Sequence, residues 1–231
     1  MIYLYSGTPG SGKSLHQARD LYYWIRAGHT AICNFDIDKY AIPCKKEPQF
    51  YYVDNEKLCP ELLIKASQIY FKNHKFKEGA IRLYIDECQL LFNAREWNVK
   101  GRKEWLSFFT QHRKYGYDIY LIAQFDRMID RQVRSLIEYE YIHRKVKNYG
   151  TWGLIFNLLA GGSLFVSVEI WYPMKEKIGS EFFKGNKRYF ELYNTYNTFD
   201  TEGVVHGFGN ENGKRDKGKI SPIAENGNYL P

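Results

Sequence analysis

The residues with the clearest chemical potential form a glycine-rich stretch close to the N-terminus. Positions 7–14 read Gly-Thr-Pro-Gly-Ser-Gly-Lys-Ser and match the pattern GxxxxGK[ST] at every fixed position. Glycines let such a loop turn so that successive backbone N–H groups face one concavity that attracts an anion. The pattern predicts a phosphate-binding loop, in which Lys13 reaches the β- and γ-phosphates of a nucleotide and the Ser14 hydroxyl binds Mg²⁺.

The elements on either side of this loop support the prediction. An apolar run at residues 2–5 ends before Gly7, and from Leu15 to Ile25 apolar residues recur every three or four positions, as in an amphipathic helix. The free amides and the dipole at the start of that helix add to the attraction for phosphate. The residues expected to contact the nucleotide are Thr8, Pro9, Gly10, Ser11, Gly12, Lys13, Ser14 and Leu15.

An acidic pair is the second chemical signal. Asp86 and Glu87 directly follow the mostly apolar run at residues 81–85, and parallel α/β sheets bind ligands at the carboxyl ends of their strands. We expect Asp86 to hold the magnesium shell, directly or through water, and Glu87 to polarise the attacking water. Taken alone, the pair also fits surface acids that cap a strand; downstream of a phosphate-binding loop it indicates a catalytic site.

Three further candidates lie around and after the apolar run at residues 119–123. Gln124 places an amide at the tip of this expected strand, where it can contact the γ-phosphate or orient water; the alternative is a glutamine that begins a loop. Arg131 and Arg134 follow, and one of them, preferably Arg134, can neutralise transition-state charge in a neighbouring subunit's site. A helix surface, or a contact with nucleic acid or a partner, is the alternative for both arginines.

Hydrophobic patterning predicts the elements that must position these residues. Strands are expected at 2–5, 30–34, 49–53, 81–85 and 118–123, and helices at 15–25, 56–76 and 102–115. Strands that alternate with helices predict an α/β fold with a mainly parallel sheet covered by helices. We expect a core domain at residues 1–148, a small β-rich extension packed on it at 149–200, and a flexible polar tail at 201–231.

The segment from Trp152 to Tyr172 is long enough to suggest a membrane span. Glu169 and several other polar residues interrupt it, and Gly161-Gly162 is typical of a turn. From Val166 to Ile170 apolar and polar residues alternate with the two-residue period of a strand. Because a carboxylate in hydrocarbon is costly, we predict a protein-packed strand pair here.

Composition limits the class of protein. The chain has 231 residues, 44% of them hydrophobic and 17% aromatic, so it can bury a core, and its net charge is +7. Basic residues gather at 95–114 and 127–147, which suits a phosphate polymer, an anionic membrane surface or an acidic partner, or is a solvated face. Four cysteines without a CxxC pair and a start without a secretory signal favour a reducing cytoplasm.

The motifs together resemble those of one known family. The phosphate-binding loop, the run LYIDECQ at 83–89 and the run QHRKYGYDIYLIAQ at 111–124 are similar to the zonula occludens toxin (Zot) family over about residues 1–200. The second of these runs is the most family-specific. The family includes the assembly ATPase of filamentous phages, which resembles FtsK/HerA-type motors.

That resemblance implies a RecA/FtsK-like P-loop NTPase fold and an ATPase that uses ATP and Mg²⁺, and no other metal, to extrude phage DNA as it acquires its coat. It also implies a homo-oligomer whose partners are single-stranded phage DNA and phage or host membrane assembly proteins. Family members commonly continue into a transmembrane helix, whereas this chain ends in a polar stretch. We therefore expect a cytoplasmic protein that reaches the inner face of the cell membrane through a partner.

The sequence is also compatible with two functions other than a motor. The first is an assembly scaffold that binds a nucleotide without hydrolysing it, because every motif residue serves binding as well as hydrolysis. The second is a P-loop kinase for a small molecule or a nucleotide. Asp86-Glu87 and Gln124 disfavour the kinase, because a kinase must exclude water rather than activate it.

Overall fold

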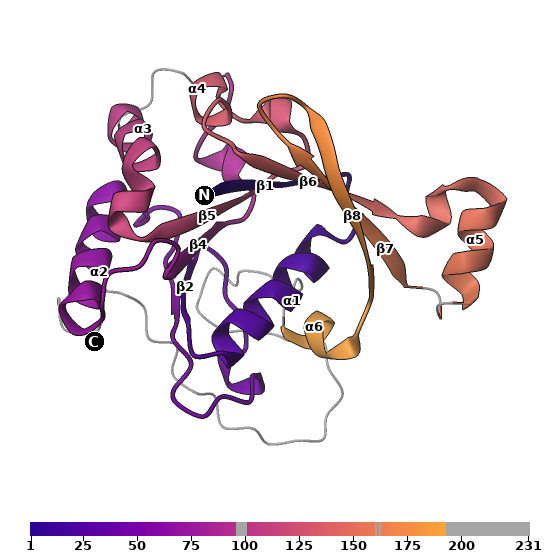
Figure 1. The fold of residues 1–231 in the computed structure, drawn as a ribbon, viewed down its shortest axis with the longest axis horizontal. Helices are drawn as coiled ribbons and strands as arrows, with labels where there is room; N and C mark the ends of the chain where they lie inside the picture. The colour runs from indigo at the N-terminus through magenta and orange to yellow at the C-terminus, as the bar shows by residue number, and fades with distance from the viewer. Residues whose placement is uncertain (96–100, 160, 162, 193–231) are drawn as a thin grey trace, which may run out of the picture.

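One eight-stranded sheet organises the protein (Figure 1). The computed structural model describes residues 1–95, 101–159, 161 and 163–192. In space the strands follow the order β3-β2-β4-β5-β1-β6-β7-β8. They are β1 (Ile2–Ser6), β2 (Thr30–Cys33), β3 (Phe50–Tyr52), β4 (Ile81–Ile85), β5 (Tyr117–Ile122), β6 (Tyr139–Lys145), β7 (Leu164–Trp171) and β8 (Glu176–Lys184). The helices are α1 (Lys13–Arg26), α2 (Pro60–Asn73), α3 (Arg102–Gln111), α4 (Arg131–Arg134), α5 (Gly150–Leu159) and α6 (Lys187–Leu192).

Six neighbouring strands, from β3 to β6, run parallel. Strand β7 runs antiparallel to β6, and β8 runs antiparallel to β7, so the two strands extend the sheet beyond β6. The predicted α/β fold with a mainly parallel, helix-covered sheet is therefore confirmed. In this order β5 lies between β1, which leads into the phosphate-binding loop, and β4, which leads into Asp86.

Each face of the sheet carries its own hydrophobic core. Alternating strand residues divide between the two faces: Leu83 and Leu121 join the core that includes α2 and α3, whereas Tyr84 joins the core that includes α1 and α6. Figure 1 shows α1 and α6 side by side on one face and α2 with α3 toward the other. Burial on both faces explains the almost continuous apolar runs of the central strands.

Residues 150–159 correct one prediction. They form helix α5 rather than a strand, so the strand pair expected from Trp152 to Tyr172 is wrong for its first half. The alternating residues 166–170 do lie in a strand, β7, but its hairpin partner is β8. Because β6 and β8 already pair with both edges of β7, residues 150–159 satisfy their backbone groups within a helix instead. Within the described ranges, no helix is long and apolar enough to cross a membrane.

Residues 149–192 continue the sheet of the preceding residues. They add β7 and β8 to the edge formed by β6, and they add α6, which packs on α1. Strand β6 itself was not predicted from the sequence. The division into a core at 1–148 and an extension at 149–200 stays a prediction, and the expected tail at 201–231 lies outside the described residues.

Candidate functional site

The glycine-rich loop joins β1 to α1 at the carboxyl edge of the sheet. The Gly7 N–H donates a hydrogen bond of 3.0 Å to the Gln124 carbonyl at the end of β5, which fixes the start of the loop. The Ser11 N–H donates to the Thr8 carbonyl at 3.1 Å and closes the turn. Gly12, with a φ of 99°, then leads into the first turn of α1. The loop thus brings its backbone amides and a helix N-terminus to one place.

Two of the loop glycines have no room for a side chain. A Cβ on Gly7 would lie 2.5 Å from the His143 carbonyl oxygen on β6. At Gly12 it would lie 2.6 Å from the ring of Phe165 on β7, and φ there is positive as well. Both fixed glycines of the motif are therefore required by contacts with strands more than a hundred residues away in the chain.

Lys13 folds back over the loop. Its Nζ donates to the carbonyl oxygens of Gly7 at 2.5 Å and Thr8 at 3.2 Å. Burial lowers the pKa of Lys13, while the carboxylates of Glu87 and Asp86 act in the opposite direction because they favour its charged form. The lysine of the loop and the acidic pair after β4 therefore share one electrostatic environment.

The acidic pair lies two strands from the loop. Strand register places Ile85 beside Leu121 of β5, and Leu121 beside Leu4 of β1, so Asp86 emerges about 10 Å from β1 at the usual strand spacing. The Glu87 N–H donates to Asp86 Oδ1 at 2.8 Å. Glu87 is exposed, has a φ of 46°, and accepts a hydrogen bond from the Gln89 amide.

Asn34, at the end of β2, holds the backbone of Asp86 in place. Its Nδ2 donates to the Asp86 carbonyl at 2.8 Å and to Asn55 Oδ1 at 2.8 Å, and its Oδ1 accepts from the Asp86 N–H at 2.7 Å. This positioning role was not predicted. A polar residue at a strand's carboxyl end was its only signal in the sequence.

We expect Asn34→Ala to lower the free energy of unfolding by about 1–3 kcal/mol, because both backbone groups of the partly buried Asp86 peptide lose their partner. Asn55→Ala is the matched control, since it removes only the side-chain end of the same group. Urea unfolding measures both variants. An equal loss of unfolding free energy in the two variants would assign the effect to the Asn34–Asn55 hydrogen bond and not to the bonds between Asn34 and the Asp86 backbone.

Gln124 lies where the sequence predicts it, at the tip of β5 between the loop and the acidic pair. It is half-buried. It lines a cavity of about 530 Å³ together with Gly7, Thr8 and His143, at the carboxyl ends of β5, β1 and β6. An amide in this position can reach a group held by the loop.

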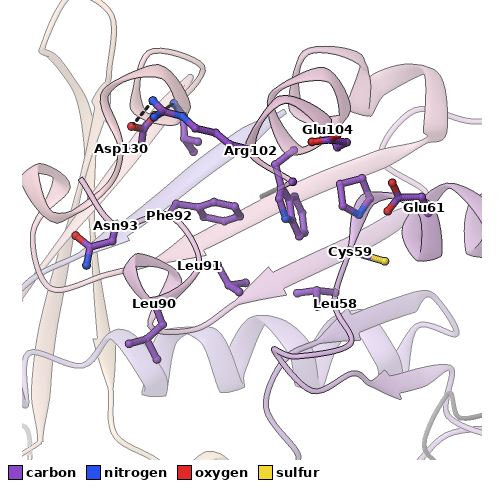
Figure 2. Close-up of a pocket in the computed structure, with 14 residues that line it drawn as sticks. Leu58, Cys59, Glu61, Leu90, Leu91, Phe92, Asn93, Arg102, Glu104 and Asp130 are labelled. Atoms are coloured by element: carbon purple, nitrogen blue, oxygen red, sulfur yellow. Dashed lines mark hydrogen bonds and ion pairs between the residues drawn. The ribbon is translucent and has the colours of Figure 1, made fainter. Parts of the chain in front are cut away.

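The two arginines lie on α4, and neither lines that cavity. Arg131 is exposed, whereas Arg134 is half-buried and donates to the Asp126 carbonyl at 3.4 Å. A second cavity of about 410 Å³ lies beside α4, at the N-termini of α2 and α3 (Figure 2). An ion pair of 2.6 Å between Arg102 and Asp130 borders it. No residue of the glycine-rich loop lines this second cavity, so we do not assign the nucleotide to it.

Two buried histidines, His16 and His143, contact each other and the backbone of Ser6, which directly precedes the loop. His143 Nδ1 lies 3.1 Å from the Ser6 carbonyl and must donate to it, so His143 Nε2 accepts from His16 Nδ1 at 2.7 Å. Burial, together with the neighbouring His16, lowers the pKa of His143 to about 3. Burial, together with Arg19, lowers the pKa of His16 to about 4. The pair is therefore neutral at neutral pH and links α1, β1 and β6.

We expect the stability of the protein to fall as the pH is lowered from 6.5. Between the ordinary histidine pKa of 6.5 and the lowered value of about 3, only the unfolded chain takes up the proton at His143. One such histidine costs about 1.4 kcal/mol per pH unit over that interval. Urea unfolding at pH 6.5 and 5 should show a smaller pH effect in His143→Gln than in the wild type. His74→Gln, at an exposed position, is the control and should keep the wild-type slope; equal slopes in all three would contradict the assignment.

The fold and the loop together define the class. A glycine-rich loop between β1 and α1, with β5 inserted between that strand and the acid-bearing β4, is the arrangement of a P-loop NTPase. The chain belongs to the family described as Zonular occludens toxin (Zot), whose model matches residues 1–199.

Individual relatives agree with this assignment. Gene 1 protein of Enterobacteria phage M13 is 27% identical over 172 residues, which are 71% of this chain and 48% of that protein. Gene 1 protein of Salmonella phage IKe is 34% identical over 85 residues, 36% of this chain and 23% of that protein. The chain thus spans about half the length of its M13 relative.

Solved structures share the fold. The N-terminal domain of zonular occludens toxin from Neisseria meningitidis superposes with a TM-score of 0.50 at 19% identity, over 84% of this chain and 98% of that one. The genome packaging NTPase B204 of Sulfolobus turreted icosahedral virus 2, in complex with ATP-gammaS, gives 0.50 at 16% identity over 79% and 96%. A further solved ATPase domain gives 0.53 at 8% identity over 84% of each chain.

Proposed function

We propose that this protein is an ATP-hydrolysing motor that drives filamentous phage assembly and the extrusion of phage DNA. The observation that carries the proposal is the convergence of three chemical groups at one edge of the sheet. They are the loop with Lys13 and Ser14, the acidic pair Asp86–Glu87, and Gln124 on the strand between them. Membership of the Zot family, with Gene 1 proteins of phages as relatives, supports the biological role.

Binding would rest on the loop. A triphosphate would replace the two carbonyl oxygens that Lys13 now contacts, and the loop amides would hold the remaining phosphate oxygens. The hydroxyl of Ser14 and the carboxylate of Asp86 are hard oxygen ligands and fit Mg²⁺, which supplies charge neutralisation for the phosphates when bound.

Catalysis of hydrolysis would rest on positioning and electrostatics, without a covalent intermediate on the protein. Glu87 would accept a proton from the attacking water, and Gln124 would orient that water toward the γ-phosphate. Asn34 would keep the backbone of Asp86 fixed during the reaction. Preorganised groups of this kind need no rearrangement when charge develops in the transition state.

A DNA cargo fits the charge of the protein. Near the carboxyl edge of the sheet, Arg127, Arg131, Arg144 and Lys147 are all exposed. Exposed cations on one side of a site attract a phosphate backbone and make the attraction salt-dependent. We propose single-stranded phage DNA as the polymer and phage or host membrane proteins as further partners.

Phosphate release by the purified protein tests this function. We expect turnover that needs Mg²⁺ and rises with single-stranded DNA, and a loss of the DNA effect at high salt. Glu87→Gln is the control for contaminating enzymes. Binding of ATP with no turnover under any condition would favour the scaffold alternative instead.

We also expect the protein to self-associate, with Arg134 completing a neighbour's site. Arg134→Ala should bind ATP normally but lose turnover by roughly a thousandfold, because an arginine supplied in trans meets charge that exists only in the transition state. Mixing Arg134→Ala with Glu87→Gln, each inactive alone, should restore part of the activity at interfaces that combine two intact residues.

The same mixing with Arg131→Ala decides which arginine acts. If mixing restores nothing while both variants still assemble, Arg134 acts within its own subunit, where it donates to the Asp126 carbonyl. An unchanged turnover in Arg134→Ala would remove it from the site altogether.

A further inference from the structure

Helix α5 displays an unusual amount of apolar surface. Six large side chains on this ten-residue helix are between 47% and 78% exposed. They are Trp152, Leu154, Ile155, Phe156, Leu158 and Leu159. Single exposed apolar residues are ordinary, but a contiguous group marks a surface that is covered in the working protein.

The helix is nevertheless held firmly at its base. Gly153 packs so closely that a Cβ there would lie 2.3 Å from the Val146 carbonyl oxygen. Asn157 Oδ1 accepts a hydrogen bond of 3.0 Å from the N–H of Leu164, the first residue of β7. In Figure 1, α5 projects beyond β6 and β7, away from α1 and α2. Its apolar display is therefore a fixed feature of the fold.

Two geometric facts define what can cover this helix. At about 100° per residue, the six exposed side chains spread over an arc of roughly 200° around the axis. A protein groove covers a narrower stripe, whereas lipid surrounds whatever is inserted into it. The helix is also only about 15 Å long, half the thickness of the hydrocarbon core, so it suits one leaflet and not a span.

The charge around α5 selects the kind of lipid. Arg144, Lys145 and Lys147 lie in the segment that leads into the helix, and Arg144 and Lys147 are exposed. The chain has no Asp or Glu between Tyr141 and Val168. A basic collar at the base of an apolar helix matches anionic headgroups that lie over acyl chains.

We propose that α5 is a peripheral membrane anchor that inserts its apolar side chains into one leaflet of an anionic bilayer. Its basic collar of Arg144, Lys145 and Lys147 contacts the headgroups. Asn148 and Tyr149, just before α5, line the 530 Å³ cavity together with Gly7 and Thr8. Membrane contact would consequently occur at the same edge of the sheet as the phosphate-binding loop. The anchor does not depend on hydrolysis.

Vesicle co-sedimentation of the full chain tests the anchor. We expect binding to vesicles of phosphatidylcholine with phosphatidylglycerol, and binding roughly tenfold or more weaker to phosphatidylcholine alone. The double variant Leu158→Ser, Leu159→Ser should lose binding to both. Phe182→Ser, at another exposed apolar position on β8 (64% exposed), is the matched control and should bind as the wild type. Arg144→Glu with Lys147→Glu should remove the preference for the anionic lipid.

Fluorescence locates the insertion. Quenching by lipids brominated on the acyl chains should be strong in the wild type and largely lost in Trp152→Phe. A wild type that stays in the supernatant with anionic vesicles overturns the proposal, and so does a double variant that binds like the wild type. If the double variant instead breaks an oligomer in light scattering while no form binds vesicles, α5 is an interface between copies of this chain. Phosphate release without vesicles should be unchanged in the double variant, which separates failure of the anchor from failure of the ATPase.

Discussion

Lys13→Ala is expected to abolish measurable nucleotide binding. The Lys13 ammonium donates to two carbonyl oxygens of the loop, and these are the bonds that a triphosphate would take over. Hydrogen bonds from a charged donor contribute about 1.5–3 kcal/mol each, so losing two of them weakens binding by roughly a hundredfold or more. The loop amides alone do not balance the charge of a triphosphate.

Titration with a fluorescent ATP analogue measures this effect. Lys65→Ala, at an exposed position on α2, is the control for a simple loss of positive charge and should bind as the wild type. Urea unfolding of Lys13→Ala should show a folded protein, because the ammonium of Lys13 donates to carbonyls of the loop and not to the core. Near-wild-type affinity in Lys13→Ala would remove the phosphate role from this loop.

Glu87→Gln should keep ATP binding and lose most turnover. An amide has the size of the carboxylate and still accepts from Gln89, but it cannot take a proton from water. Removing a positioned general base costs roughly a hundred- to ten-thousandfold in rate. Since Glu87 is exposed and lies at the turn after β4, its replacement should leave the fold intact.

Phosphate release and the fluorescent titration, run on the same preparation, separate the two steps. Glu61→Gln, at an exposed position on α2, is the matched control and should turn over normally. An unchanged rate in Glu87→Gln would make Glu87 a surface acid and strengthen the scaffold alternative. A loss of binding as well as turnover would instead place Glu87 in the binding of magnesium or phosphate.

The sequence by itself was sufficient for the fold class and for the places of the glycine-rich loop and of Asp86 at the ends of their strands. Each of these depends on local spacing: Gly7 to Ser14 act as one loop, and Asp86 is delivered by the strand immediately before it. The parallel strands were recognisable because helices cover both faces, so nearly every residue of β4 and β5 is apolar.

Strand β6 was not recognised in the sequence because two of its buried residues, Glu140 and His143, are polar. Glu140 is buried and accepts a hydrogen bond of 2.7 Å from Ser6, and His143 is buried against His16. These partners lie more than a hundred residues away along the chain. The hydrophobic periodicity of such a strand is interrupted by its charged residues, because the hydrogen bonds that allow them to be buried form only with the sheet.

Helix α5 and the hydrogen bonds from Asn34 to the backbone of Asp86 also depend on contacts between distant parts of the chain. The apolar pattern of residues 152–159 fits a strand or a helix equally well. Because β6 and β8 already occupy both edges of β7, these residues form a helix. Asn34 acquires its role only when β2 pairs with β4 and brings it to the Asp86 peptide. Local patterns determine which residues can do chemistry, whereas contacts between distant strands decide which of them meet, because strand pairing and burial are properties of the whole sheet.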